Sequence, residues 1–311
     1  MIIDKYCDKE NIDGEIYQNK AEILLEALPY IKEYFNRIVV VKLGGAIMED
    51  DDSLDNVLND IVLMKYVGIK VVLVHGGGKQ ITKLLQEKNI DVKFCEGLRI
   101  TDKDSLDAVK MVLLGEVNSK IVTFLNKHGK IAVGVSGNDA NFINCSKKKY
   151  KKDDKEIDLG FVGEIMDIDE IFLTKMLDND YIPVIASLGS DNNGNIYNIN
   201  ADTCACEISS KLKAKKMILL TDVDGIKLTE TGLQKLISKL SIKGAEKLIK
   251  ENIISKGMIP KVRACIDALN NSVEKAHILN GNHPHSILIE IFTNKGIGTM
   301  IVKDNEKELK G

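Results

Sequence analysis

Two glycine clusters follow apolar, β-branched runs early in the chain. Gly44-Gly45 comes after a run that includes Lys42, and Gly76-Gly77-Gly78 comes after the next such run. Glycine lets backbone N–H groups approach an anion without an intervening Cβ, and a following helix N-terminus adds positive potential. A single cluster could equally be a tight strand-to-helix turn. Two clusters after neighbouring parallel strands favour a cradle for anionic groups.

Familiar nucleotide-binding motifs do not account for this cradle. The chain contains no G-x-x-x-x-G-K-[ST] loop, because the second cluster lacks both the spacing and the hydroxyl. Gly296-Ile297-Gly298 lacks the third glycine of the dinucleotide fingerprint, and the H-R-D loop of protein kinases is missing from the sequence. Phosphate chemistry would therefore require another architecture.

The elements around the clusters alternate between short apolar strands and amphipathic helices. Helical spacing follows both clusters, from Leu54 to Met64 and from Ile81 to Leu85. The expected strands are Ile38 to Leu43, Ile69 to Val74, Ile131 to Val135, Ile182 to Ala186, Lys216 to Leu220 and His277 to Leu279. This alternation predicts an α/β protein, an open three-layer αβα sandwich with a mainly parallel central sheet.

The remaining segments predict how the chain is divided. Polar, alternating residues between about Asn141 and Ile168 predict a β-hairpin beside the sheet. A dense turn cluster from Ser190 to Asn195 predicts a lobe boundary near Gly189. We therefore expect an N-terminal extension and oligomerisation helix over 1–36, one lobe over 37–189 and a second lobe over 190–311.

The N-terminal segment from Ala21 to Phe35 carries apolar residues every three or four positions, which predicts an amphipathic helix. Pro29 removes one backbone hydrogen bond inside it, so a kink is expected there. A helix placed ahead of an otherwise complete core must bury its apolar face on that core or on another subunit. Spacing alone does not decide between these two partners.

Composition excludes several classes of protein. The 311 residues are 44% hydrophobic and 29% charged, as in soluble globular proteins with about two lobes. The net charge of -3 provides no basic field for nucleic acid, and acidic residues follow the lysine run from Lys147 to Lys152, which favours a solvated loop. We expect no membrane partner and a cytoplasmic location, because the sequence shows neither a long apolar span nor a signal-peptide core. The six scattered cysteines are expected to be reduced thiols.

Seven short segments carry a specific resemblance. In chain order they are Val41-Lys42-Leu43-Gly44-Gly45, Val74-His75-Gly76-Gly77-Gly78, Gly97-Leu98-Arg99-Ile100-Thr101, Ser136-Gly137-Asn138-Asp139, Asp158-Leu159-Gly160-Phe161-Val162-Gly163, Asn198-Ile199-Asn200-Ala201-Asp202 and Gly257-Met258-Ile259-Pro260-Lys261. From Lys42 to its last strand, the chain resembles the N-acetylglutamate kinases of the amino acid kinase family. The resemblance implies that family's fold. It also implies ATP-dependent phosphorylation of the side-chain carboxylate of N-acetyl-L-glutamate to N-acetyl-glutamyl 5-phosphate, the second step of arginine biosynthesis.

The resemblance implies catalytic roles for two lysines and one aspartate. Lys42 would hold the transferring phosphoryl group from one side and Lys261 from the nucleotide side, with Asp202 fixing both ammonium groups. These groups suit phosphoryl transfer, which needs positioning and charge neutralisation more than covalent help. Lys42 could otherwise be an exposed strand-end lysine, and Asp202 could be a helix N-cap, a role compatible with orienting the lysines.

The resemblance also implies the residues that bind the substrate. Gly76 and Gly77 would bind the acceptor carboxylate through backbone N–H groups, and Arg99 would grip a substrate carboxylate with its planar guanidinium. Asn198 would hydrogen-bond the acetylated amino-acid end. The alternatives are a surface salt bridge for Arg99 and support of a turn for Asn198.

ATP with Mg²⁺ is the implied cofactor. The residues expected to bind ATP are Gly44, Gly45, Thr221, Asp222, Asp224 and Gly225. The two aspartates could instead be turn formers. Mg²⁺ would bind mainly to the ATP phosphates, so we expect no metal site in the protein itself. A carboxylate acceptor is already ionised at neutral pH, so no general base is needed and His75 is expected to be a buried, non-catalytic histidine.

The N-terminal helix and the C-terminal region are similar to the arginine-inhibited branch of this family. The similar segments are Leu24 to Ile31, His277 to Phe292 and Gly296 to Thr299. The similarity implies inhibition by L-arginine and a hexamer, a trimer of dimers in which the N-terminal helices interlace. The implied arginine site contains Tyr30, His277, Glu290 and Gly296. Asn282 departs from the arginine that this branch commonly carries, and the C-terminal cluster could otherwise be simple lobe packing.

Two rival functions remain at this stage. Another member of the superfamily would phosphorylate carbamate, aspartate, free glutamate or a nucleoside monophosphate, but Arg99 together with Asn198 favours an acylated amino acid. A non-catalytic arginine sensor on the same scaffold is the other rival. The presence of Lys42, Asp202 and Lys261 argues against a sensor, which would need none of them.

Overall fold

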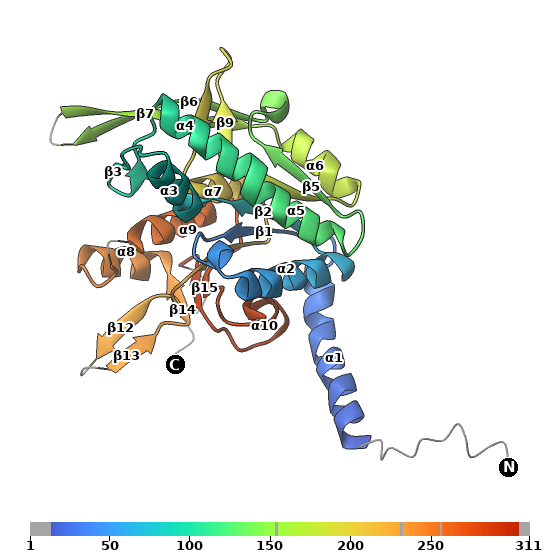
Figure 1. Cartoon of the computed structure of the whole chain (residues 1–311). Coiled ribbons are helices and arrows are strands. Elements are labelled where there is room, and N and C mark those ends of the chain that lie inside the picture. Colours follow the sequence, from blue (N-terminus) through green and yellow to red (C-terminus); the bar gives the residue numbers. More distant parts are fainter. Residues whose placement is uncertain (1–13, 153–154, 231–232, 256, 305–311) are drawn as a thin grey trace.

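An eight-stranded sheet forms the centre of the molecule in the computed structural model, which describes residues 14–152, 155–230, 233–255 and 257–304 (Figure 1). Its strand order is β14-β16-β15-β11-β1-β2-β8-β5. In that order the strands are Lys239–Ser241, Thr299–Val302, Lys275–Asn280, Lys216–Thr221, Ile38–Leu43, Lys70–His75, Ile182–Ala186 and Ala132–Ser136. The neighbours are parallel except β15 and β16. The predicted α/β class with a mainly parallel sheet is confirmed.

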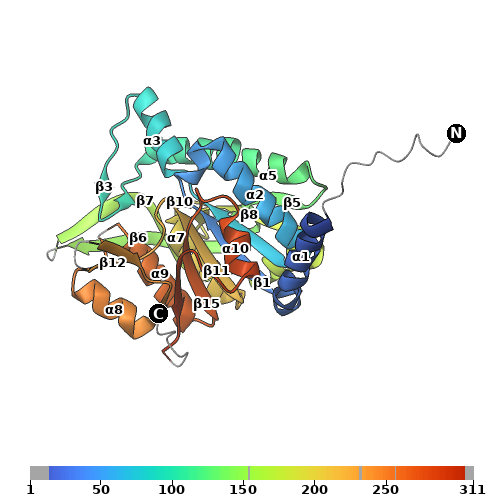
Figure 2. The same cartoon turned by 90° about the horizontal axis from the view of Figure 1, so that it is seen from below.

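Alternate side chains of the strands point to opposite faces of this sheet. Val40 packs into a core with α6 (Glu170–Asp178), α7 (Ala201–Lys211), α8 (Ile242–Lys250) and α9 (Ile259–Asn270). Val39 and Val41 face α2 (Asp51–Tyr66), α3 (Gly78–Glu87), α4 (Lys103–Lys110), α5 (Ser119–Asn126) and α10 (Ser286–Phe292). Helices therefore cover both faces, and the view from below shows α2 and α10 close together (Figure 2). The predicted three layers are present.

A small four-stranded closed sheet lies beside the main one. It consists of the long hairpin β6 (Ile143–Lys152) and β7 (Lys155–Ile168), with β9 (Leu188–Ser190) and β10 (Ile196–Asn198). The hairpin predicted between Asn141 and Ile168 is confirmed. The turn cluster from Ser190 to Asn195 joins β9 to β10 within this sheet, and the lobe division at Gly189 stays a prediction.

Several short elements complete the described part of the chain. Two hairpins stand apart from the sheets, β3 (Phe94–Cys95) with β4 (Leu98–Arg99), and β12 (Lys227–Glu230) with β13 (Leu233–Leu236). Two 3₁₀ turns, η2 (Ile47–Glu49) and η4 (Asp139–Asn141), follow strand ends. A π-helical segment, η3 (Met111–Asn118), connects α4 to α5 without a turn between them.

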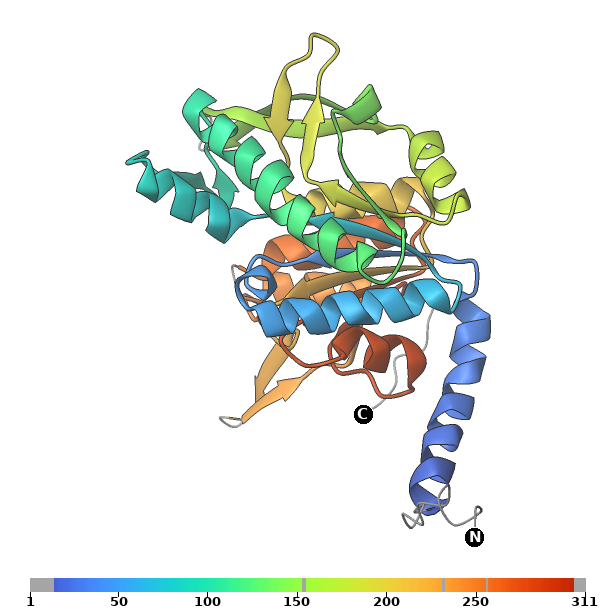
Figure 3. The same ribbon diagram turned by 45° about the vertical axis from the view of Figure 1, so that its right-hand side comes forward.

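The N-terminal helix α1 (Gly14–Tyr34) begins earlier than predicted and continues through Pro29 without a break. Residues 1–13 of the expected extension lie outside the described residues. The last turn of α1 docks on its own chain, because Tyr34 is buried and α1 packs against α10. The rest of α1 projects away from the body (Figure 3). Its apolar residues Ile23, Leu24 and Leu25 are 64%, 73% and 66% exposed.

Other expectations concern the surface and the thiols. No helix in the described ranges combines the length and the apolarity that a membrane span requires. The basic run was expected to be a solvated loop but lies on strand β6, where Lys147 and Lys148 are 2.8 and 4.0 Å from Asp158 and Glu164 of β7. The free cysteines in the described residues are Cys95, Cys145, Cys204, Cys206 and Cys265, and Cys7 lies outside that part.

Candidate active site

Lys42 lies near the C-terminal end of β1 and on the same face as Val40, because side chains two apart on a strand share a face. That face is covered by α7 and α9. The Lys42 side chain is only 8% exposed, which excludes an exposed strand-end lysine. A buried ammonium group needs an anionic partner, so the residues at the ends of these two helices decide its role.

The N-terminus of α7 supplies that partner. Asn200 is the N-cap, and its Oδ1 accepts hydrogen bonds from the backbone N–H groups of Asp202 (2.9 Å) and Thr203 (3.0 Å). Asp202 is therefore not the cap, and its carboxylate is available for the lysines. A carboxylate in the first turn also suits the positive end of the helix dipole.

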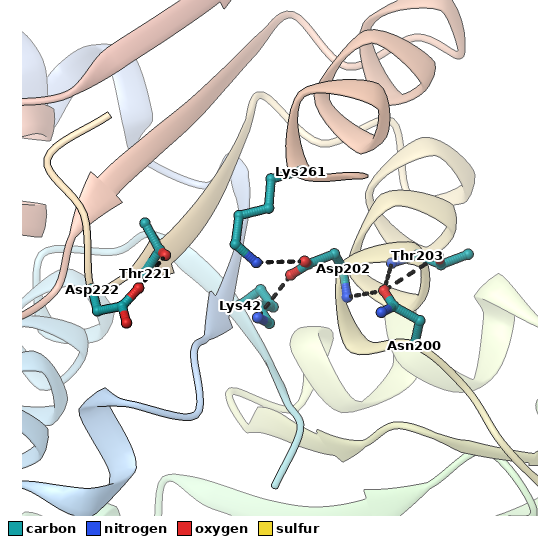
Figure 4. Close-up of polar contacts among 7 residues, drawn as sticks. All are labelled: Lys42, Asn200, Asp202, Thr203, Thr221, Asp222 and Lys261. Carbon is teal, nitrogen blue, oxygen red and sulfur yellow. Dashed lines mark hydrogen bonds and ion pairs between the residues drawn. The ribbon is translucent and has the colours of Figure 1, made fainter. Parts of the chain in front are cut away.

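Lys261 completes the group from the first turn of α9. A cation at the N-terminal end of a helix is disfavoured by the helix dipole, so this placement requires compensation. Asp202 provides it, with Oδ2 lying 2.8 Å from Lys261 Nζ and Oδ1 lying 2.7 Å from Lys42 Nζ. Figure 4 shows both ammonium groups directed at this one carboxylate.

Electrostatics keep this carboxylate ionised. Burial raises the pKa of Asp202, but the charges of Lys42 and Lys261 outweigh burial and hold the pKa at about 2. Burial lowers the pKa of Lys42, and the Asp202 carboxylate opposes that shift. The site thus holds one anion between two cations, which leaves a positive field for an incoming phosphate.

The two glycine clusters border the same cleft, which has a volume of about 460 Å³. Gly44 has no room for a side chain, because a Cβ would lie 2.5 Å from the carbonyl oxygen of Leu220. A Cβ on Gly77 would lie 2.9 Å from Leu113 Cδ2. α3 begins directly after Gly77, and Gly78 and Lys79 of its first turn line the cleft. The two glycine turns thus present backbone to the cleft, and their role as an anion cradle stays a prediction.

Arg99 reaches this cleft from β4 and is 8% exposed, so the surface salt bridge is wrong. Its Nη2 donates hydrogen bonds to the carbonyl oxygen of Gly78 (2.8 Å) and to Thr82 Oγ1 (2.8 Å), and Phe94 stacks 4.7 Å from the guanidinium. Nη1 is buried and lacks a hydrogen-bond partner among the described residues. A ligand oxygen would satisfy it.

Asn198 lines the same cleft, at the end of β10. Its Nδ2 donates a hydrogen bond to Thr101 Oγ1 at 3.3 Å. This contact orients the amide and leaves its carbonyl oxygen for a ligand.

The predicted nucleotide loop follows β11. Thr221 and Asp222 line the cleft, and Asp222 also lines a second cavity of about 490 Å³. Asp224 and Gly225 border only that second cavity, whose apolar residues are Val223, Ile226, Ile253, Ile254 and Met258.

Asp224 holds this loop in place. It pairs with Lys227 at 2.8 Å and accepts hydrogen bonds from Asn280 Nδ2 (2.8 Å) and His283 Nε2 (3.0 Å). The Asn280 contact, followed by the Lys227 and His283 contacts, keeps the pKa of Asp224 well below its usual range. The residue is thus more than a plain turn former.

Comparisons with known proteins agree with this geometry. The sequence profile described as "Amino acid kinase family" matches residues 37–280. The acetylglutamate kinase of Petrotoga mobilis is 45% identical over 295 residues, covering 95% of this chain and 96% of that protein. The acetylglutamate kinase of Archaeoglobus fulgidus is 48% identical over 285 residues, covering 90% and 98%. The chain belongs to the acetylglutamate kinases of the amino acid kinase family. It is therefore a phosphotransferase.

A solved structure extends the likeness. N-acetylglutamate synthase from Neisseria gonorrhoeae, complexed with coenzyme A and N-acetyl-glutamate, matches with a TM-score of 0.82 at 27% identity over 91% of this chain. In its complex with coenzyme A and L-arginine the TM-score is 0.78 at 26% identity. This kinase chain spans 63% and 65% of the synthase chains, so it corresponds to only part of that protein.

Three of the four residues predicted for arginine lie together in this kinase, and one of them, Glu290, belongs to α10. His277 Nδ1 is 2.8 Å from Glu290 Oε1, and a Cβ on Gly296 would lie 3.4 Å from Oε2 of the same carboxylate. Burial, aided by the charge of Lys216, lowers the pKa of His277 to about 4. The ring is therefore neutral near pH 7, and its Nε2 is buried without a partner in the part of the chain described.

Tyr30, the fourth residue, is half-buried on α1, and in the described ranges no hydrogen bond or ion pair joins it to His277 or Glu290. Tyr34, one turn later, lies closer to the cluster. Its ring is 5.2 Å from Lys216 Nζ, which in turn lies 3.5 Å from the carbonyl oxygen of Glu290. Burial lowers the pKa of Lys216 to about 8.

Several residues around these sites were not predicted from the sequence. Asn200 was signalled by its position two residues before Asp202, where an N-cap is expected. Nothing in the sequence marked Lys216 as functional, since it follows Lys215 at the start of a strand, where lysines are common. Asn118, which contacts His75 across 43 residues, was not marked either.

Proposed function

We propose that this acetylglutamate kinase transfers the γ-phosphoryl group of ATP to the side-chain carboxylate of N-acetyl-L-glutamate in the cytoplasm, as the second step of arginine biosynthesis. The observation that carries the proposal is the carboxylate of Asp202 held between Lys42 and Lys261, on the wall of a cleft bordered by two glycine loops. Phosphoryl transfer needs such fixed charge around the transferring group.

The proposed mechanism is charge neutralisation with little proton transfer. Lys42 and Lys261 would contact the oxygens of the transferring group, where negative charge is spread in the transition state. Asp202 keeps the two ammonium groups in place, so they need not reorganise during the reaction. The acceptor carboxylate attacks as an anion, and the N–H groups of Gly76 and Gly77 would align it with the phosphorus.

Recognition of the acceptor falls to Arg99 and Asn198. The buried, unpartnered Nη1 of Arg99 supports contact with the α-carboxylate of the substrate, because charged hydrogen bonds are strong in a buried site. The amide of Asn198, oriented by Thr101, would accept or donate to the acetamido group. Together they select an acylated amino acid with two carboxylates.

The nucleotide would span the two adjoining cavities. Asp222 lines both, so we place the phosphates near Gly44, Gly45 and Asp222 and the base against the apolar residues around Asp224 and Gly225. In the described ranges no group of three His, Cys, Asp or Glu side chains could hold a metal ion. We propose that Mg²⁺ arrives bound to the ATP phosphates.

A substrate panel tests the proposal. ADP release and trapping of the acyl phosphate with hydroxylamine are measured for N-acetyl-L-glutamate, L-glutamate, L-aspartate and carbamate. We expect kcat/KM for N-acetyl-L-glutamate to exceed that for each other acceptor by about 10²-fold or more, because buried polar groups left unpaired penalise the wrong substrate. Faster turnover of any other acceptor would overturn the assignment. Arginine binding without any turnover would instead identify a sensor.

We further propose that L-arginine inhibits this enzyme and that it assembles as a hexamer through α1. The buried His277–Glu290 pair supports a guanidinium site, since a carboxylate in a buried position is the natural partner for that group. The exposed apolar residues of α1 support burial against another subunit, because isolated apolar helix faces of this size are costly in water. Tyr34 connects α1 to the cluster around Glu290.

Removal of residues 1–28 tests both parts of this regulation. The deletion removes the exposed Ile23, Leu24, Leu25 and Leu28 but keeps the buried Tyr34. Sedimentation is expected to show dimers, kinase activity should persist, and arginine inhibition should be lost.

Glu290→Gln is the matched control for this deletion. It should weaken arginine inhibition by about tenfold, the value of one charged hydrogen bond, without changing the oligomer. An unchanged sedimentation profile after the deletion would refute the role of α1.

A further inference from the structure

His75, the last residue of β2, belongs to a series of hydrogen bonds that connects Gly76, His75, Asn118 and Val184. Its side chain is fully buried. Nδ1 lies 3.0 Å from the carbonyl oxygen of Gly76, and Nε2 lies 3.0 Å from Nδ2 of Asn118. The same Nδ2 donates a hydrogen bond to the carbonyl oxygen of Val184 at 2.9 Å. The chain thus runs from β8 through Asn118 and His75 to the glycine loop.

The two ends of this chain fix the positions of all its protons. A carbonyl oxygen can only accept, so the Val184 oxygen requires the NH₂ group of Asn118 on its side. That NH₂ group also faces Nε2 of His75, which must then accept. Nδ1 therefore carries the ring proton and donates it to the carbonyl oxygen of Gly76. Burial lowers the pKa of His75 to about 4, so this neutral tautomer persists at neutral pH.

The direction of the Gly76 carbonyl determines the direction of the Gly77 N–H. In a trans peptide, the C=O and the N–H of one unit point in opposite directions. His75 lies on the buried side of the loop, whereas Gly76 and Gly77 line the cleft. A carbonyl held towards the buried ring therefore turns the N–H of Gly77 towards the cleft.

The π-helical segment η3 packs against the glycine loop. Val112 and Leu113 pack where Gly77 lacks a side chain, and a Cβ there would lie 3.2 and 2.9 Å from their methyl carbons. Gly134 leaves room for Asn118, since a Cβ on it would lie 2.0 Å from Asn118 Oδ1. π-helical segments are rare and are frequent at functional sites. Here the segment places both the packing residues and Asn118.

We propose that His75 is a positioning residue which, oriented by Asn118 at the end of η3, aims the Gly77 N–H at the acceptor carboxylate. This inference rests on the proposed function, because it assumes that the glycine loop receives the acceptor. His75 exchanges no proton with the substrate. It acts only through the Gly76–Gly77 peptide.

Two substitutions at His75 separate this role from a structural one. The amide nitrogen of asparagine falls at the position of Nδ1. The amide of glutamine reaches the position of Nε2, where its oxygen can accept the hydrogen bond from Nδ2 of Asn118. His75→Asn keeps the donor to Gly76 but loses the contact with Asn118 and leaves a small cavity. His75→Gln keeps the contact with Asn118 and most of the volume but loses the donor to Gly76.

The two variants are expected to rank in opposite order for activity and stability. His75→Gln should lose about 10- to 100-fold in kcat, the effect of a small misplacement of a reacting group, with an unchanged KM for ATP. His75→Asn should be the more active variant by about tenfold and yet have the lower Tm, because it creates a cavity. Activities that follow the melting temperatures would overturn the proposal.

Asn118→Asp tests the same hydrogen bonds from the other end. An oxygen facing Nε2 favours the other tautomer and leaves the lone pair of Nδ1 against the Gly76 carbonyl. We expect a loss of kcat similar to that of His75→Gln, and no further loss in the double variant, because both act through one hydrogen bond. Additive losses would contradict a shared mechanism.

Crystal structures of the two His75 variants distinguish this inference from the proposed function. The Gly76–Gly77 peptide should keep its orientation in His75→Asn and rotate in His75→Gln, whatever the substrate is. If the wild-type enzyme does not phosphorylate N-acetyl-L-glutamate, only the proposed function is overturned. If the Gly76–Gly77 peptide does not rotate in His75→Gln, only the positioning role is overturned.

Discussion

Lys42→Met is expected to lower kcat on the order of 10²- to 10³-fold, the cost of removing one preorganised group that stabilises transition-state charge. Methionine has a similar length and lacks the charge, so packing at the 8% exposed side chain is preserved. Asp202 retains Lys261 at 2.8 Å, and no buried charge is left alone. The Tm should therefore stay the same or rise, since buried ion pairs are often replaced by apolar groups without loss.

Steady-state kinetics with a thermal melt on the same samples check this expectation. Lys261→Met is the matched control on the other side of the carboxylate, and it should also reduce kcat while leaving Lys42 paired with Asp202. Equal effects of either substitution on turnover and on stability would contradict a catalytic role. Such a result would reduce the two lysines to structural partners of Asp202.

Asp202→Asn is expected to damage both activity and stability. An amide oxygen can accept from one lysine, but the NH₂ group then faces the other ammonium, and Lys42 loses its counter-charge in a buried position. Removal of one partner from a buried pair costs about 3–5 kcal/mol, a fall in Tm of roughly 5–10 °C. Turnover should fall at least as far as in Lys42→Met, because both lysines lose their orientation.

The pH dependence of the stability difference between wild type and Asp202→Asn is a further check. The pKa of Asp202 is about 2 in the folded protein and 3.8 as the ordinary value, so the unfolded chain binds this proton at the higher pH. The stabilisation by the carboxylate is fully present above about pH 4 and is lost as the pH falls towards 2. The free-energy difference between wild type and Asp202→Asn should be constant from pH 5 to 8 and shrink below pH 4. A difference that grows on acidification would be inconsistent with the ion pair.

Local sequence patterns predicted much of the architecture. The strands Ile38–Leu43 and Ile182–Ala186 match the prediction in both bounds, and four others shift by one or two residues. Continuous apolar runs followed by glycine are local signals that persist wherever a strand lies in a buried parallel sheet. Strands β14 and β16, of three and four residues, were not predicted because runs this short carry no period and exist through pairing with each other and with β15.

The candidate site was also predicted only in part from the sequence. The residues themselves determined that two glycine turns follow neighbouring strands, and the ordered motifs placed Lys42, Asp202 and Lys261 in one family pattern. Spacing alone did not decide between Asp202 as a cap and Asp202 as the partner of the lysines. The tertiary structure decided it, since Asn200 caps α7 and leaves the carboxylate free.

Only the packed sheet brings the remaining groups together. Lys261 meets Asp202 across 59 residues, and Asn118 meets His75 across 43, because α7 and α9 share one face of the sheet while η3 lies on the other. Periodicity reports which face of an element is apolar, but contacts between distant elements depend on how the whole sheet is ordered. The sequence by itself therefore determined the strands, the glycine turns and the chemistry available. The tertiary structure decided which charges share a carboxylate and which histidine tautomer stands behind the glycine loop.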